Sequence, residues 1–142
     1  MFANTERSII DRLRAKMPPG VTVAPLRELE QVPELRQKAP AVWVVYDGYT
    51  VADSVAHGGV QQVRQEWFVV VAAKSARKNG EVDAARDAAA LLCEQVLAAL
   101  LGFHLGGGRY LQLGPAPGPE YDAGYCHVPL AFSNAATFRG EP

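Results

Sequence analysis

The sequence predicts an α+β fold: a mainly antiparallel (mixed) sheet of about four to five strands with helices packed on one face. Two runs, residues 41–46 and 67–73, stay apolar at every position instead of alternating. Successive side chains of a strand point to opposite faces, so both faces of these strands are hydrophobic. Only one long helical pattern follows the strands, whereas an all-parallel sheet needs several crossover helices. We therefore expect a mainly antiparallel sheet.

Two or three helices cover one face of such a sheet and leave the apolar side chains of the other face without cover. We expect that face to pack against another subunit. The aromatic and β-branched residues of the two runs are the candidates for core or subunit-interface packing: Trp43, Val45, Tyr46, Trp67, Phe68 and Val70.

Length and charge limit the classes of function. A chain of 142 residues is expected to form a single domain, residues 1–142. Its 14 Lys and Arg residues balance 15 Asp and Glu residues to a net charge of -1, so no global basic field exists to hold nucleic acid or an anionic membrane. The first residues lack the apolar core of a signal peptide, and no stretch approaches the roughly 20 apolar residues of a membrane span. A soluble, intracellular protein is expected.

The N-terminal third predicts a helix, a short strand and the first apolar strand. Asn4 or Thr5 is expected to cap the helix, and the Pro-Pro-Gly run at 18–20 to stop it. A strand over 21–24 follows, and 26–37 is interpreted as a loop or irregular helix. The first apolar strand is expected to end at the turn signal Asp47-Gly48. The apolar positions of the helix fall on one face: Ile9, Ile10, Leu13 and Met17.

Residues 49–63 are polar, contain glycine and have a weak hydrophobic pattern, which suits a long hairpin arm or a mobile loop between two antiparallel strands. Such an arm is a candidate contact with a neighbouring subunit. Its candidate residues are Tyr49, Val51, Asp53, Val55 and His57.

The longest helix is predicted to start at residues 81–83 and to stop at Gly102. Its apolar stripe is Val82, Ala85, Ala89, Leu92, Val96 and Leu100. An exposed connection at 75–80 precedes it. Arg77, Lys78 and Arg86 form a small basic cluster that is either solvated or touches phosphate or an acidic partner.

The C-terminal part is rich in glycine and proline. Residues 106–108 are interpreted as a linker to a short strand at 109–113, and 114–119 as a stiff exposed connection. The last strand is expected over 124–132, at an edge or with a bulge because Pro129 has no amide hydrogen. Residues 133–142 are interpreted as a polar tail that is disordered or packs on a partner.

The sequence offers no catalytic, metal or cofactor-binding residue. Neither a phosphate-binding Gly-Lys-Ser/Thr nor a Gly-x-Ser-x-Gly motif is present. The three histidines lie far apart in the sequence, and Cys93 and Cys126 lack the spacing of a zinc or redox motif, so both are expected to be free, buried thiols. Asp53 and His57 could meet as an acid–base pair, but a solvated loop is the simpler interpretation.

Several packing patterns together resemble the tail terminator proteins of long-tailed bacteriophages and prophages, especially the Mu-like kind. They are the amphipathic N-terminal helix, PAVWVVYDG at 40–48, QEWFVVV at 65–71, LLGF at 100–103, and Tyr121-x-x-Gly-Tyr125 before PLAF at 129–132. The resemblance spans most of the chain, and none of these patterns is a chemical motif.

The resemblance implies a small subunit that forms a homo-oligomeric ring, commonly a hexamer, on the head-proximal end of the tail tube. Such a ring ends tube polymerisation and provides the head-attachment surface. Its implied partners are other copies of itself, the tail tube protein and a head-completion or connector protein, with DNA passing through the lumen unbound and no membrane involved. The implied location is the virion tail, with assembly in the host bacterial cytoplasm, and no catalytic residue or cofactor is implied.

Two alternatives remain at this point. The first is another head–tail connector or a tail-tube subunit. The second is a small-ligand-binding or enzymatic domain that uses Asp53, His57 and the loop at 106–108.

Overall fold

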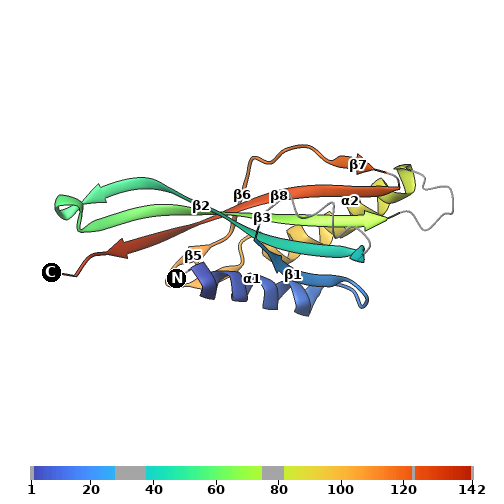
Figure 1. The fold of residues 1–142 in the computed structure, drawn as a ribbon. Coiled ribbons are helices and arrows are strands. Elements are labelled where there is room, and N and C mark those ends of the chain that lie inside the picture. The colour runs from blue at the N-terminus through green and yellow to red at the C-terminus, as the bar shows by residue number, and fades with distance from the viewer. Residues whose placement is uncertain (1, 28–37, 75–81, 123, 142) are drawn as a thin grey trace.

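The computed structural model describes residues 2–27, 38–74, 82–122 and 124–141. The helices α1 (Phe2–Lys16) and α2 (Val82–Leu100) lie against one face of a six-stranded sheet (Figure 1). The strand order is β1 (Thr22–Leu26), β2 (Ala41–Val55), β3 (Val60–Lys74), β8 (Tyr125–Arg139) and β6 (Gln112–Gly114), and β7 (Glu120–Asp122) also pairs with β8. Of these pairs, β1 with β2 is parallel and the others are antiparallel. The predicted α+β class is confirmed.

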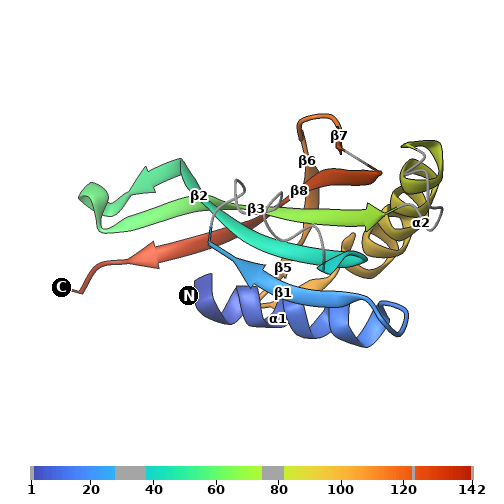
Figure 2. The ribbon, with the colours of Figure 1, turned by 45° about the vertical axis from the view of Figure 1, so that its right-hand side comes forward.

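Three strands of 15 residues each, β2, β3 and β8, form the centre of the sheet. β3 pairs with β8 without a register shift over its whole length, from Val60 opposite Arg139 to Lys74 opposite Tyr125. One half of this three-stranded unit packs on the helices. The other half projects past the N-terminal end of α1, as Figures 1 and 2 show. We call this projecting part, residues 47–66 and 133–139, the arm.

The turn between β2 and β3 lies farther along the chain than Asp47-Gly48, where the sequence predicted it. β2 continues to Val55, and the short 3-10 turn η2 (Ala56–Gly58) connects it to β3. Gly48 has a φ of 91° and lies within a register shift between Tyr46 and Tyr49. The Asp-Gly pair therefore forms a β-bulge instead of ending the strand. The predicted hairpin arm is present, as strand rather than loop.

The main core lies between the helices and the sheet. Alternate side chains of β2 and β3, such as Val44, Trp67 and Val69, point toward the helices and are at most 1% exposed. Five of the six predicted stripe residues of α2 face them and are buried, namely Ala85, Ala89, Leu92, Val96 and Leu100, and the side chain of Val82 lies outside the described ones. From α1 the buried residues are Thr5, Ile9, Ile10 and Leu13.

The opposite face of the sheet has a smaller cluster of its own. Trp43 and Val70 are each 2% exposed there, and they group with Ala39, Ala41 and Ala72. A single chain thus already covers side chains that we expected to face another subunit. The continuously apolar runs reflect burial on both faces within one subunit.

Helix α1 begins at Phe2, so Asn4 and Thr5 lie inside it and do not cap it as predicted. The ring of Phe2 stacks on that of Tyr46, with centroids 4.8 Å apart and planes 2° from parallel. This tertiary contact favours helical structure two to three residues before the predicted cap. The helix ends at Lys16, just before the two prolines, as expected.

The glycine run at 106–108 turns a small hairpin and is not a linker. It joins β4 (His104–Gly106) to β5 (Arg109–Tyr110), and all three glycines have positive φ. Pro129 lies opposite Val70 of β3, between the stretches of β8 that β7 and β6 pair. Neither short strand reaches that position, so its missing amide hydrogen costs no ladder hydrogen bond on that side, and β3 and β8 show no bulge.

Strand β8 continues to Arg139, where the sequence predicted the start of a polar tail at residue 133. Ser133 and Asn134 are buried, and the strand pairs with β3 throughout. Asn, Ala and Ser have low strand propensity, so the pairing with β3 and the polar contacts described below decide the structure here. Of the predicted loop or irregular helix at 26–37, Leu26 belongs to β1 instead, and residues 28–37 lie outside the described residues, as does the connection at 75–80.

Candidate assembly surface

The arm carries the five residues that the sequence predicted as arm contacts with a neighbour. Tyr49 and Val51 are each 57% exposed and Val55 is 44% exposed, while Asp53 and His57 are also exposed. Such large apolar side chains on a projecting element form an unusual surface for a single chain. The arm is therefore the first candidate for a protein–protein contact.

The two faces of the arm differ in character. On the face that continues the helix side of the sheet, the rings of Tyr49 and Phe138 meet edge to face, with centroids 5.8 Å apart and planes at 87°. Val63 of the central strand is 2% exposed on this face, between Val51 and Ala136 in the ladder. The arm thus has a small apolar layer of its own, with Tyr49 and Val51 open to solvent.

A buried polar network lies where the arm leaves the body. The indole Nε1 of Trp67 donates a hydrogen bond of 2.8 Å to Oδ1 of Asn134. The amide nitrogen of Asn134 donates to Oε1 of Gln65 at 3.0 Å and to the carbonyl of Ala135 at 3.1 Å. Each buried polar group of this set therefore has a partner, which fixes β3 and β8 relative to each other at this point.

The aromatic candidates of the body are part of its packing. Trp67 is 1% exposed, and its ring lies 4.7 Å from that of Tyr46. Trp43 and Val45 are 2% and 3% exposed, and Phe68 is half-buried. These residues position the strands from which the arm extends.

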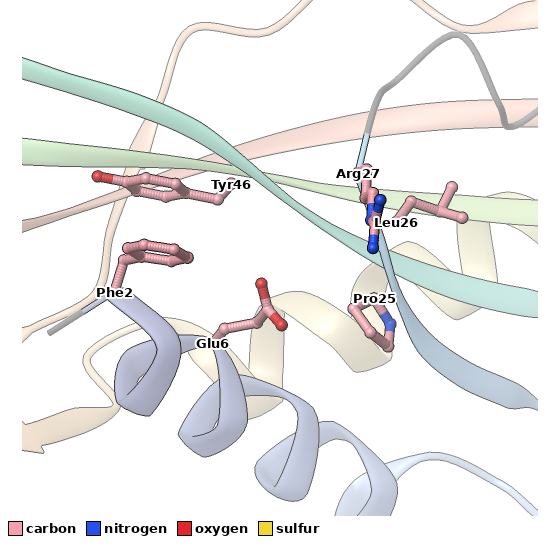
Figure 3. A pocket seen from close by; sticks show the side chains of 6 residues that line it. All are labelled: Phe2, Glu6, Pro25, Leu26, Arg27 and Tyr46. Atoms are coloured by element: carbon pink, nitrogen blue, oxygen red, sulfur yellow. The ribbon is translucent and has the colours of Figure 1, made fainter.

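An open groove of about 460 Å³ separates the start of α1 from the end of β1 (Figure 3). In Figure 3 the stacked rings of Phe2 and Tyr46 form one end of it, and Glu6 projects into it from α1. Pro25, Leu26 and Arg27 line the opposite wall. Among the described residues that line the groove, Glu6 is the one carboxylate, and these residues form no acid–base pair or activated nucleophile.

The outer edges of the sheet differ in whether their backbone groups have hydrogen-bond partners. At β1, the guanidinium of Arg14 donates two hydrogen bonds to the carbonyl of Val23, of 3.2 Å from Nε and 2.9 Å from a terminal nitrogen. In the arm, the outer edges of β2 and β8 have no strand partner among the described residues, because β1 pairs only as far as Val45 and β6 only as far as Ser133. A side chain thus occupies a backbone carbonyl on the outer edge of β1, whereas the outer edges of β2 and β8 in the arm are open among the described residues.

The remaining sequence candidates are not brought together into a chemical site. Oδ1 of Asp53 accepts a 2.8 Å hydrogen bond from the backbone amide of Ser54, and the described contacts include none between Asp53 and His57. Arg86 is exposed on α2, whereas Arg77 and Lys78 lie outside the described residues. Within the described ranges, no three His, Cys, Asp or Glu residues are grouped so that they could hold a metal ion.

The two thiols are free and buried, as the sequence predicted. Burial raises the pKa of Cys93 to about 11, and the nearby Cys126 thiol adds to this increase. Burial also raises the pKa of Cys126, against an opposing effect of the Arg86 charge. Both groups are therefore protonated and unreactive at neutral pH.

Sequence reasoning missed four residues of the arm and its junction: Gln65, Asn134, Phe138 and Arg139. The apolar residues Val60, Val63 and Trp67 are spaced by three and four positions, which is not the alternation of a strand, so no local pattern extended β3 into the arm. Residues 134–139 of β8 are mostly small or polar and also lack that alternation. Their partner strand lies far away in the sequence.

Neither α1 nor α2, the two helices of the described residues, combines the length and the apolar character that a bilayer crossing requires. A search of curated proteins found no match. A comparison with protein-family models matched the family described as phage tail terminator protein over residues 2–141. The Mu-like kind stays a prediction. Because the match covers nearly the whole sequence, and the fold is the α+β architecture expected from the resemblance, this chain belongs to the phage tail terminator family.

Proposed function

We propose that this protein forms a ring, of six subunits, that caps the head-proximal end of the tail tube, ends its polymerisation and presents the surface to which the head attaches. Membership of the family makes it a structural component of the phage tail. The observation that supports the proposal of a ring is the arm, which extends away from a subunit that has its own hydrophobic core.

The exposure of the arm supports this proposal. Its apolar side chains Tyr49, Val51 and Val55 are 44–57% exposed in one chain. Burying them against a neighbour is favourable by roughly 25 cal/mol for each Å² of apolar surface. A subunit that uses different patches toward its two neighbours forms a closed ring when the rotation closes.

The charge of the chain also suits a ring around DNA. The net charge is -1, and basic residues do not dominate the arm, which has Arg64 and Arg139 against Asp47, Asp53 and Glu66. Dense basic contacts would hold the duplex through its phosphates, so a near-neutral subunit lets DNA pass. We propose a role without catalysis or cofactor, with assembly in the host cytoplasm and with the tail tube protein and a head-completion protein as partners.

Light scattering over a concentration series, followed by negative-stain imaging of the same sample, tests the ring. We expect discrete rings with a mass close to six subunits. Long tubes would instead identify a tube subunit, and a monomer at every concentration would contradict the ring.

The terminating activity needs a separate test with the tail tube protein. Added rings are expected to bind one end of each growing tube and to stop its elongation at a ratio of about one ring per tube. Tubes that grow equally long with and without the ring would contradict the terminator role.

A further inference from the structure

We propose that the arms of neighbouring copies join edge to edge: the open edge of β8 over residues 134–139 pairs with the open edge of β2 over residues 49–55 in the next copy. This inference rests on the proposed ring and assigns the surface that holds it together. The partner is a second copy of this chain.

Each arm presents two different open edges on its two sides. On β8, β7 pairs with Tyr125–His127 and β6 with Ala131–Ser133, and no described strand pairs beyond Ser133 on that side. On β2, β1 pairs no farther than Val45. Both strands are antiparallel to β3, so they run in the same direction. Rotation of one copy about an axis along the arm therefore brings β2 beside β8 of its neighbour as a parallel pair, head to tail.

The contrast with β1 indicates that the arm edges are suited to pairing with another chain. Proteins protect open strand edges because an unpaired ladder recruits other chains. At β1 the carbonyl of Val23 is occupied by Arg14, and Pro25 has no amide hydrogen to offer. On β8, residues 134–139 contain neither proline nor lysine and show no bulge against β3.

The edge of β8 opens into a groove that suits the side chains of an added strand. The groove has a volume of about 610 Å³ and lies between the hairpin turn at Gly107, Gly108 and Arg109 and the stretch of β8 that ends in Phe138. Gly107 and Gly108 have open space where a side chain would be. When a strand joins a sheet edge, its alternate side chains enter such a groove and give specificity.

Tyr49 and Val51 are the side chains that fit this groove. Both lie on the face of β2 that also carries Phe138 across the arm, since the rings of Tyr49 and Phe138 touch. Both are 57% exposed, so docking would remove the most exposed apolar side chains of the arm from water. With the two arms side by side at equal height, the neighbour's Tyr49 would lie level with Asn134 and its Val51 beside Ala136, which lines the groove.

Opposite charges lie on the two edges at nearly the same height of the arm. Asp53 on β2 is opposite Gln62 and Thr137, and Arg139 on β8 is opposite Val60, two residues farther along β3. Both side chains therefore project from the same face, about 7 Å apart along the strand direction. An arginine side chain spans that offset, so every junction would place Asp53 beside Arg139 of the neighbour.

Charge reversal of these two residues tests the junction. Asp53→Arg gives two positive edges and Arg139→Asp gives two negative edges, so each single variant is expected to need at least about tenfold more protein to form the ring. The double variant Asp53→Arg/Arg139→Asp restores opposite charges at every junction and is expected to assemble as the original chain does. Arg64→Asp, on the central strand of the arm, is the matched control and should assemble normally.

Light scattering reads the mass of each variant, and circular dichroism verifies that each is folded. Rings from both single variants at the original concentration, or no recovery in the double variant, would overturn the edge-to-edge junction while leaving the ring intact. If the chain without substitutions stays monomeric, both the edge-to-edge junction and the ring would be overturned. A one-to-one mixture of the single variants should also recover rings, with the two variants alternating, as an even number of subunits allows.

Discussion

The indole nitrogen of Trp67 and the side-chain oxygen of Asn134 are joined by a buried hydrogen bond of 2.8 Å between adjacent strands. The indole can only donate, so Asn134 must present its oxygen to Trp67 and its amide nitrogen to Gln65, 3.0 Å away. The three side chains are 1–2% exposed. This network lies where the arm meets the body, and it therefore sets the direction of the arm.

Asn134→Ala is expected to lower the free energy of unfolding by roughly 2–4 kcal/mol, because it leaves the buried Trp67 indole nitrogen and the Gln65 side-chain oxygen without Asn134 as their partner. Urea unfolding followed by circular dichroism measures this loss. Thr137→Ala, an exposed change on the same strand, is the control and should cost less than about 1 kcal/mol. Equal midpoints for the two variants would show that the network does not contribute to stability.

Trp67→Ala is expected to lower the free energy of unfolding by roughly 3–5 kcal/mol, because it removes a buried ring and leaves a cavity beneath the helices. Trp67→Phe keeps part of the ring and loses the hydrogen bond to Asn134, so its loss should be smaller. Thermal melting of both variants gives the comparison. An unchanged melting curve for Trp67→Ala would contradict the burial of this ring.

The body of the fold was predictable because its signals are local. The apolar stripe of α2 and the two apolar runs are hydrophobic patterns that burial explains directly, and both appear in the structure. The run around Trp43 was recognised as buried on both faces. The chain that covers its second face was not predicted correctly, because a sequence pattern does not say whether the same chain or another one covers a strand.

The arm was only partly predictable because its strands depend on each other. The sequence indicated a hairpin arm between β2 and β3, but it placed a turn at Asp47-Gly48 and a polar tail after Phe132. Gly48 satisfies a bulge as well as a turn, since both need a positive φ. Asn134 becomes a strand residue through its contacts with Gln65 and Trp67, which lie 69 and 67 positions away in the sequence.

Shortening the arm is expected to prevent ring formation while leaving the subunit folded. The variant lacks residues 52–62 and joins Val51 to Val63, which face each other in the ladder, through an Asn-Gly turn. The main core contains no residue of the deleted stretch, so the body should keep its cooperative unfolding. Light scattering measures whether rings form, and thermal melting measures whether the body is folded. A shortened chain that still forms rings would contradict a role of the arm tip in assembly.

Arg14→Ala is expected to promote non-specific association, because it exposes the carbonyl of Val23 at the edge of β1. Light scattering during incubation at raised temperature measures the effect. Arg7→Ala removes the same charge from an exposed position of the same helix and is the control. The same rate of aggregation in both variants would show that net charge, rather than the uncapped edge, is responsible.

Stability is expected to fall as the pH rises from about 9 to about 11, in part because of Cys93. Its pKa is raised from 9.0 to about 11 in the folded chain, mainly by burial. Below pH 9 the thiol is protonated in both states and adds no pH dependence. Between the two values the unfolded chain releases the proton and the folded chain retains it, so unfolding becomes more favourable as the pH rises.

Urea unfolding at about pH 8.5 and 10.5 isolates this contribution when the original chain is compared with Cys93→Ala. The two proteins share every other ionisable group, so the difference between their pH slopes belongs to Cys93. We expect the original chain to lose on the order of 1–2 kcal/mol more than the variant over this interval. Parallel pH profiles would mean that the thiol ionises equally well in both states. That result would contradict its burial between α2 and the sheet.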